Sequence, residues 1–135
     1  MGHAAEQEQI LDLVRSVHGD TTNLKASECV VAVTEGKIVG CVRVRKLPDG
    51  TLKLASLGVY PEYRRYGVGS EVVKKLLSTF TQRPLYLMCF PELEQFYRNN
   101  GFVKIAGTDL PPILRVDHDQ HVARTGQEVL CMVIR

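Results

Sequence analysis

The chain has 135 residues, of which 44% are hydrophobic and 24% are charged, and its formal net charge at pH 7 is +2. This length predicts a single domain, residues 1–135, that can bury a hydrophobic core. So small a charge argues against a nucleic-acid partner, and no apolar run reaches the roughly 18–20 residues that span a bilayer, which argues against a membrane protein.

The first part of the chain predicts one helix followed by three strands. Residues 5–18 place apolar side chains on one helical face, and Gly19 suits the end of that helix. A polar loop over 20–27 follows. The next runs have the β-branched or alternating composition of strands: Cys29–Thr34, Lys37–Arg45 (in which Val42 and Val44 alternate with Arg43 and Arg45) and Thr51–Val59. The turns between these runs are short, which favours an antiparallel meander.

The sequence then changes to helical spacing. Residues 69–80 predict an amphipathic helix, and Leu85–Phe90 predicts a short apolar strand. Pro91 can open another helix, which Asn100-Gly101 would cap. Two further runs read as a last strand pair, Phe102–Ile105 and Val129–Ile134. The long polar segment between them, roughly 107–127, predicts no element.

The order of these elements sets the fold class. A strand, a helix and a second strand follow one another over residues 51–90, and this order implies parallel pairing of the two strands. The other connections are short and favour antiparallel pairing. The predicted class is therefore α/β, with a mixed, mostly antiparallel central sheet that contains one parallel strand pair.

The junction between the third strand and the next helix is the most informative stretch. Here Arg64-x-x-Gly67-x-Gly69 forms a basic turn at the start of a helix. Both glycines permit φ > 0, and the exposed amides of residues 65–70 could cradle a diphosphate beside the positive end of the helix dipole. The same glycines would also serve a tight turn with no ligand. Neither the P-loop nor the Rossmann glycine pattern fits, because Gly69 is followed by Ser70 rather than Lys and the turn follows a meander.

This stretch resembles the GNAT superfamily of acetyl-CoA-dependent N-acetyltransferases, whose motif is Gln/Arg-x-x-Gly-x-Gly/Ala. The preceding Leu57–Tyr63 is similar to the family's lead-in. A second family segment, a Phe-Tyr dipeptide shortly before Gly-Phe, is matched by Phe96–Phe102. The two segments occur in the family's order, and the resemblance covers roughly residues 28–105.

The resemblance implies a fold and a set of roles. The strands at 51–59 and 85–90 would splay apart and leave a slot for acetyl-CoA, the cosubstrate. Tyr97 would be the general acid that protonates the departing thiolate, although a tyrosine on the apolar face of a helix could equally be a packing residue. The main chain at the slot would bind the pantetheine arm through Leu57, Gly58 and Val59. The pyrophosphate would be held by Arg64, Arg65, Tyr66, Gly67, Val68, Gly69 and Ser70.

Three features depart from the family pattern. Phe90 stands where many members carry an asparagine that contacts the cofactor. Thr51–Val59 contains no carboxylate, so it offers no glutamate base; the comparable position is near Lys53. The family usually begins with a strand, whereas this chain is predicted to begin with a helix. The missing first strand would leave a sheet edge that a second copy could cover in a homodimer.

Other clusters of reactive side chains have plainer interpretations. The segment 117–121 has two histidines and two aspartates and is predicted to be a solvated loop without a metal; it could also supply the missing base (through His118 or Asp119) or attract a cationic amine. Cys89 could be a nucleophile, but a cysteine in a buried strand usually packs. The four cysteines, Cys29, Cys41, Cys89 and Cys131, lie in or beside apolar runs without a C-x-x-C pair. They predict reduced thiols and, with the polar N-terminus, a cytoplasmic protein.

Together these observations predict an N-acetyltransferase in which a primary amine attacks acetyl-CoA directly. The alternative is a catalytically silent acyl-CoA-binding or regulatory module. The acceptor stays open between a peptide N-terminus, a lysine side chain, a polyamine and a drug-like amine, because the residues that would select it match no known pattern.

Overall fold

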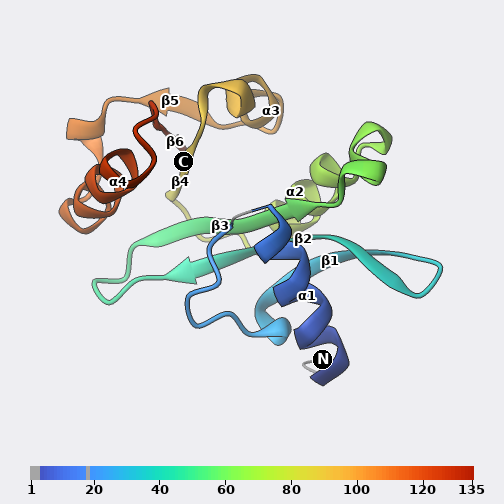
Figure 1. Cartoon of the computed structure of the whole chain (residues 1–135). Helices are drawn as coiled ribbons and strands as arrows, with labels where there is room; N and C mark the ends of the chain where they lie inside the picture. The colour runs from blue at the N-terminus through green and yellow to red at the C-terminus, as the bar shows by residue number, and fades with distance from the viewer. Residues whose placement is uncertain (1–3, 18) are drawn as a thin grey trace. The chain divides into compact units, whose positions relative to one another are not determined.

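The structure is a computed structural model that describes residues 4–17 and 19–135; residue 18, the last of the predicted first helix, lies outside them. Figure 1 shows the course of the chain. In chain order the helices and strands are α1 (Ala4–Ser16), β1 (Cys29–Thr34), β2 (Lys37–Lys46), β3 (Leu52–Val59), α2 (Val68–Thr79), β4 (Leu85–Cys89), α3 (Glu94–Asn99), β5 (Val103–Ile105), α4 (Pro112–Thr125) and β6 (Leu130–Ile134). Short 3-10 helices precede β1, α2, α3 and α4.

The strands of the described chain form one mixed sheet in the order β1-β2-β3-β4-β6-β5. Antiparallel pairing joins β1 to β2, β4 to β6 and β5 to β6. β3 and β4 pair in parallel, with Leu52 opposite Leu85 and Lys53 opposite Tyr86. The predicted α/β class, the parallel strand pair and the last antiparallel pair are therefore confirmed. The splaying of β3 from β4 stays a prediction, as does a homodimer through a sheet edge.

The chain divides into two compact units. The first comprises Met1–Arg45 and Leu54–Thr81, and the second comprises Lys46–Lys53 and Gln82–Arg135. Each unit has its own hydrophobic core. None of the helices among the described residues is long and apolar enough to cross a membrane.

In the first unit, the side chains of β2 face two different helices. Ile38 and Cys41 pack with the apolar face of α1, which includes the fully buried Leu13. Val39 packs instead with Val68, the first residue of α2. In β3, a Cβ added at Gly58 would meet Leu13 of α1, whereas the next residue, Val59, packs with Val68. Because neighbouring strand residues face opposite sides of a sheet, α1 and α2 cover opposite faces of these strands. Figure 1 shows the two helices on either side of β2 and β3.

Two glutamines of α1 tie the helix to the chain that follows it. The Gln7 side chain donates to the Leu24 carbonyl at 2.8 Å and accepts from the Ala26 amide at 2.7 Å. The Gln9 side chain accepts from the Ile38 amide at 3.1 Å. The loop between α1 and β1 is therefore held by specific hydrogen bonds and not only by apolar packing.

In the second unit, the segment that the sequence left unassigned folds into a helix. α4 spans Pro112–Thr125, so it occupies most of the segment for which the sequence predicted no element, and the solvated loop predicted for 117–121 was wrong. Proline at the start of the helix and Gly126 in the left-handed region (φ 66°) at its end are standard helix boundaries. Leu110 and Leu114 bury the helix against Cys131. Most of its remaining positions are polar, which hid the helical pattern.

Candidate active site

The turn from β3 into α2 is built around the first residue of the predicted motif. The Nε of Arg64 donates a hydrogen bond of 3.0 Å to the carbonyl oxygen of Val59, the last residue of β3. Between β3 and α2 the chain forms a 3-10 helix, Pro61–Tyr66, which includes Arg64. Gly67 then adopts φ 73° and ψ 18° and caps α2. This left-handed conformation is one that glycine adopts without strain, as the motif predicted.

The start of α2 offers main-chain amides to a ligand. Gly67 accepts the first helical bond, from the Glu71 amide at 3.0 Å. The amides of Val68 and Gly69 precede that bond and have no carbonyl one turn back in the helix. They lie at the positive end of the dipole of a 12-residue helix. A Cβ added at Gly67 would meet no atom within 4 Å, so the space next to this backbone is open. Gly69 is an ordinary helical residue, so of the two predicted glycines Gly67 is the one whose left-handed φ is used.

A close contact between α2 and β2 fixes where these amides stand. A Cβ added at Gly40 would come within 2.6 Å of a Val68 methyl group. Val68 is buried among Val39 and Val59. Glycine at position 40 therefore lets the first turn of α2 lie directly on the sheet. Sequence reasoning missed this requirement, because Gly40 lies inside a strand and its neighbour is 28 residues away.

The last residues of β3 present their main chain in alternating directions. The Tyr60 amide donates to the Val39 carbonyl of β2 at 3.1 Å. Amides of successive strand residues point to opposite sides, so the amide and carbonyl of Val59 point away from β2. This carbonyl is the group that Arg64 binds. The Val59 amide therefore points to the same side as this carbonyl, away from β2.

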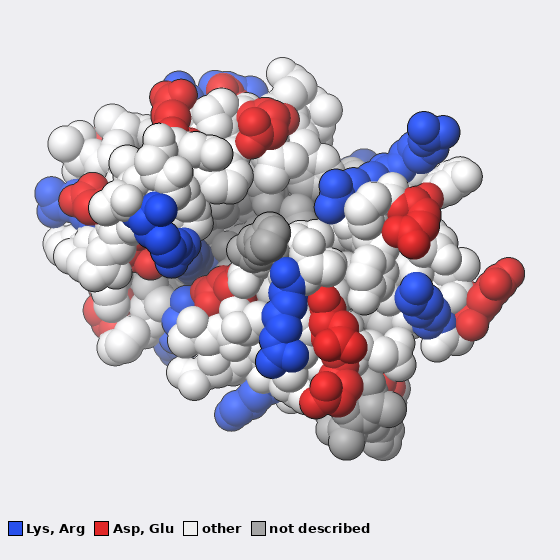
Figure 2. All heavy atoms as spheres, in the orientation of Figure 1, with Lys and Arg blue, Asp and Glu red and all other residues white. Residues whose placement is uncertain are grey.

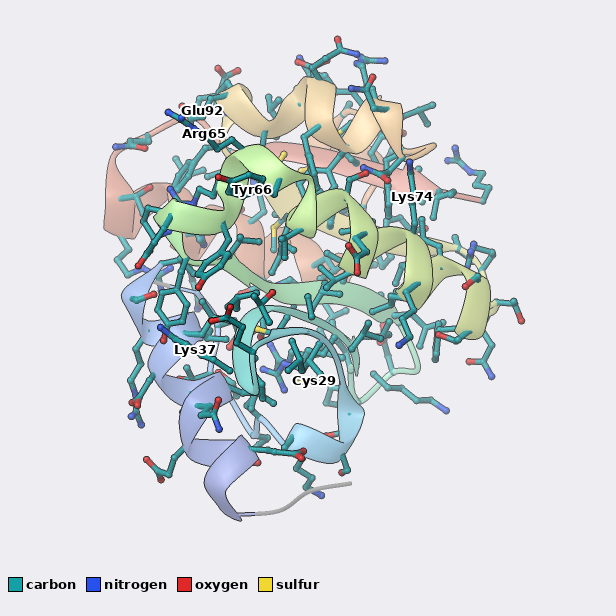
Figure 3. All side chains as sticks on the ribbon, turned by 90° about the vertical axis from the view of Figure 1, so that its right-hand side faces the viewer. Cys29, Lys37, Arg65, Tyr66, Lys74 and Glu92 are labelled. Carbon is teal, nitrogen blue, oxygen red and sulfur yellow. The ribbon has the colours of Figure 1, made fainter. Side chains whose placement is uncertain are left out.

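The basic side chains at this turn belong to the turn itself and are those of Arg64 and Arg65. Arg65 and Tyr66 lie in the turn before α2, and Tyr66 is 73% exposed (Figure 3). On the face that Figure 2 shows, lysines and arginines are interspersed with acidic side chains. That face of the molecule therefore has no continuous positive patch.

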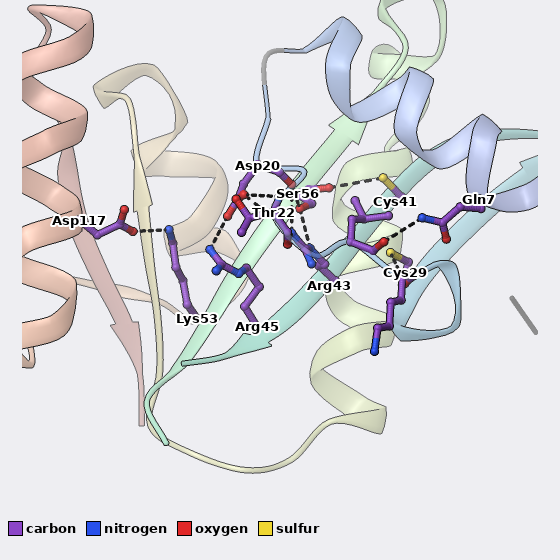
Figure 4. Close-up of polar contacts among 12 residues, drawn as sticks. Gln7, Asp20, Thr22, Cys29, Cys41, Arg43, Arg45, Lys53, Ser56 and Asp117 are labelled. Atoms are coloured by element: carbon purple, nitrogen blue, oxygen red, sulfur yellow. Dashed lines mark hydrogen bonds and ion pairs between the residues drawn. The ribbon is translucent and has the colours of Figure 1, made fainter. Parts of the chain in front are cut away.

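A buried arginine stands beside the strand that leads into this turn. Arg43 is 2% exposed, and its Nε donates to the Ser56 hydroxyl at 2.8 Å. Its Nη2 donates to the carbonyls of Thr22 at 2.8 Å and Asp20 at 3.2 Å. The Ser56 hydroxyl donates to the Asp20 carbonyl, and Arg45 pairs with the Asp20 carboxylate at 2.6 Å. Figure 4 shows this network. Burial lowers the pKa of the Arg43 guanidinium, and Asp20 opposes that shift.

Tyr97, the predicted general acid, is buried in the second unit. It is 4% exposed, and its ring meets those of Phe96 and Phe102 edge-on, with centroids 5.1 and 5.8 Å away. Burial raises the pKa of Tyr97, and the nearby Cys89 raises it further. The phenol therefore keeps its proton at neutral pH, as a proton donor must. The ring contacts equally fit the packing role that the sequence left open.

Around the end of β4, charged side chains from α4 are paired. Lys53, at the position that the family comparison associated with a base, pairs its Nζ with the Asp117 carboxylate at 2.7 Å. The His121 ring lies tilted against that of Phe90, with the ring centroids 5.7 Å apart, and its Nδ1 accepts a 3.1 Å hydrogen bond from Arg124. Burial lowers the pKa of His121, and Arg124 lowers it further, so the imidazole is neutral at pH 7.

His118 links α4 to the start of β6. Its Nε2 lies 2.9 Å from the Val129 carbonyl, which can only accept, so Nε2 carries a proton. Its Nδ1 lies 3.3 Å from the Asp119 carboxylate. The prediction that His118 and Asp119 lie in a loop was wrong, since both belong to α4.

The cysteines are unpaired thiols in apolar surroundings. Burial is the main cause that raises the pKa of Cys89 to about 11 and that of Cys41 to about 12. A thiol with so high a pKa is a poor nucleophile at neutral pH, which favours the packing interpretation of Cys89. Within residues 4–17 and 19–135, no three His, Cys, Asp or Glu side chains are grouped as metal ligands would be.

The sequence matches a known protein family. The acetyltransferase (GNAT) domain model matches residues 25–104, which is more than half of the chain. The chain therefore belongs to the GNAT acetyltransferase family. The matched range includes the β3–α2 turn and Tyr97. Comparison of the sequence with curated proteins found no match.

Solved structures share the fold at low sequence identity. N-acetylglutamate synthase from Neisseria gonorrhoeae, complexed with coenzyme A and N-acetyl-glutamate, has a TM-score of 0.78 at 18% identity over 99% of this chain and 34% of that chain. Rv2747 from Mycobacterium tuberculosis, in complex with CoA, has a TM-score of 0.76 at 19% identity, over 98% of this chain and 95% of that chain. Escherichia coli ElaA has a TM-score of 0.71 at 16% identity, over 98% of this chain and 92% of that chain. The chain thus spans about a third of the length of the synthase, and at these identities the likeness concerns the fold.

Proposed function

We propose that the protein transfers the acetyl group of acetyl-CoA to a primary amine by direct attack. The observation that carries this proposal is the β3–α2 turn: the residues that match the family motif form a left-handed glycine cap at the start of a 12-residue helix, with open space next to the cap. Such a cap suits the diphosphate of coenzyme A. The coenzyme A in the structures of fold relatives supports the choice of ligand.

The proposed chemistry assigns a task to each part. The free amine attacks the thioester carbonyl, and the negative charge on its oxygen is stabilised by the Val59 amide, which points away from β2. Collapse of the intermediate breaks the carbon–sulfur bond and expels the thiolate. Tyr97 gives its proton to that thiolate, and the acetylated amine loses its own proton to a base.

A residue outside β3 would supply that base. β3 has no carboxylate, and the ammonium of Lys53 is paired with Asp117. Nδ1 of His118 faces the Asp119 carboxylate at 3.3 Å, so these two side chains form a candidate pair for that base. His118→Ala and Asp119→Ala variants test this assignment: a turnover equal to that of the wild type in both would place the base elsewhere.

The acceptor is proposed only as a class, a primary amine. N-acetyl-glutamate in the structure of the gonococcal synthase suggests that amino acids belong among the amines to be tested. A peptide N-terminus, a lysine side chain, a polyamine and a drug-like amine complete the panel, since each presents the same nucleophile.

One specific observation favours a second function, that of an acyl-CoA-binding module without transfer. Phe90 takes the family's asparagine position; its ring contacts that of His121 and has no polar group to offer a cofactor. Release of free thiol from acetyl-CoA over the amine panel distinguishes the two functions. Thiol release that depends on an amine supports transfer, whereas thermal stabilisation by CoA with no thiol release supports binding alone. Neither effect at millimolar CoA would contradict both.

A further inference from the structure

Ser56 has a main-chain conformation that its residue type does not favour. Its φ is 60°, in the left-handed region, although it lies inside β3. The other described non-glycine residues with positive φ, Asn23 and Glu35, lie in a loop and a turn. A left-handed L-residue costs about 1–2 kcal/mol and persists only where its surroundings hold it.

The side chain of Arg43 holds Ser56 in this left-handed conformation. The guanidinium bonds to the Ser56 hydroxyl, and that hydroxyl bonds to the Asp20 carbonyl, which Arg43 also binds. One cation thus fixes the side chain of Ser56 together with the loop between α1 and β1. No buried side-chain nitrogen or oxygen among the described residues lacks a partner, so the network is complete as it stands.

The stability of the fold does not by itself explain why the charged Arg43 is buried beside Ser56. Removing a guanidinium from water costs several kcal/mol, and apolar residues of similar size often stabilise a core as well or better. The thiol of Cys41 also donates to the carbonyl oxygen of Ser56, with a distance of 3.4 Å between sulfur and oxygen. An apolar pair in place of Arg43 and Ser56 would fill the space but would leave the left-handed turn without a fixed orientation.

The turn lies directly before the main chain that the proposed reaction uses. A left-handed residue in a strand bends it and changes the direction in which the following groups point. Those groups are Leu57, Gly58 and Val59, one to three residues after Ser56.

We propose that Arg43 is a positioning residue for acetyl transfer: by its bonds to Ser56 and to the α1–β1 loop, it sets the direction in which the Val59 amide meets the acyl group. This inference rests on the proposed function. Arg43 itself does not touch the reacting atoms in this role. The diphosphate is held elsewhere, at Gly67, so loss of Arg43 affects turnover far more than CoA affinity.

The test compares Arg43→Met with Arg45→Met. Arg45 lies on the same strand and binds the Asp20 carboxylate at 2.6 Å, but no bond joins it to Ser56. Calorimetry with CoA gives the affinity and the fraction of molecules able to bind, and kcat is then expressed per binding molecule. We expect Arg43→Met to lower this kcat by about tenfold or more, with a CoA Kd within about threefold of the wild type, because small misplacements of reacting groups have large effects on rate. Arg45→Met should change kcat by less than about twofold.

Two more variants keep the test decisive if Arg43→Met does not fold. Ser56→Ala removes only the hydroxyl and should lower kcat by about threefold to tenfold with CoA affinity retained. Arg43→Lys keeps the charge but has no planar fork, so it should not restore turnover. Wild-type kcat per binding molecule in Arg43→Met, or in Ser56→Ala if the former is unfolded, overturns the inference. A wild type that binds CoA but acetylates no amine contradicts the proposed function and the inference together, whereas an active wild type with unaffected variants contradicts the inference alone.

Discussion

The Nε of Arg64 donates a 3.0 Å hydrogen bond to the carbonyl oxygen of Val59. The first residue of the motif therefore closes back on the strand that precedes it. Its side chain is engaged with the protein itself, so in the proposed cofactor site it would shape the turn as well as add charge. Arg64 couples the direction of the Val59 main chain to the position of the α2 amides.

Replacement of Arg64 should weaken CoA binding by way of this turn. Arg64→Met removes the bond to Val59, and we expect the CoA Kd to rise by about threefold to tenfold, because a typical intramolecular hydrogen bond contributes a net of about 0.5–1.5 kcal/mol. Arg64→Lys restores the charge but not the fixed Nε geometry, so its affinity should stay below that of the wild type. Titration calorimetry measures both variants. Equal affinities in Arg64→Lys and wild type would mean that charge alone matters.

Two glycines offer a matched test of the phosphate cradle. Gly67 and Gly36 have nearly the same φ, 73° and 76°, and a Cβ would meet no atom within 4 Å at either. Alanine at each position should therefore destabilise the fold equally, by about 1–2 kcal/mol. We expect only Gly67→Ala to weaken CoA binding, by about tenfold, because its methyl group would occupy the space proposed for the diphosphate. Thermal unfolding with and without CoA separates the two effects. An unchanged CoA-induced shift in Gly67→Ala would place the diphosphate elsewhere.

The parts of the fold that could be predicted from the sequence are those set by local patterns. The strand Cys29–Thr34 was predicted with its observed bounds, because a β-branched run ends at the turn residues Glu35 and Gly36. Positive φ was expected to be open to both Gly67 and Gly69, because glycine adopts it freely, and Gly67 alone of the two has it. In both cases the signal lies within a few residues of the feature that it predicts.

The missed features depend on partners that are distant in the sequence. Arg43 alternates with Val42 and Val44 as an exposed strand residue would, yet it is buried because Ser56 and the α1–β1 loop meet it there. Serine is not a residue that signals a left-handed turn in a strand. α4 was missed because few of its residues face a core, and Leu114 is its one fully buried side chain among the described residues. No local rule could have found these three features.

Tyr97→Phe separates the catalytic and packing roles of this residue. Phenylalanine keeps the edge-on contacts with Phe96 and Phe102, so the variant should fold and bind CoA as the wild type does. Loss of the hydroxyl should lower kcat by about 100-fold if Tyr97 donates the proton. Steady-state kinetics at saturating acetyl-CoA provides the measurement. A kcat equal to that of the wild type would assign Tyr97 to the core alone, and Cys89→Ala, next to it, serves as the control for a small packing change.

Buried thiols should make the protein less stable in alkali. Burial raises the pKa of Cys41 from its ordinary value of 9.0 to about 12, so the folded chain keeps a proton that the unfolded chain releases above about pH 9. The unfolded state then binds fewer protons than the native state, and the free energy of unfolding falls as the pH rises from 9 toward 12. The raised pKa values of Cys89 and Tyr97 act in the same direction. Urea unfolding between pH 7.5 and 10.5 should show a stability that is level up to about pH 8.5 and then declines. Cys41→Ala should be less stable at pH 7.5 by about 1 kcal/mol, yet should lose less with rising pH than the wild type does. The same decline in wild type and variant would mean that Cys41 contributes none of it.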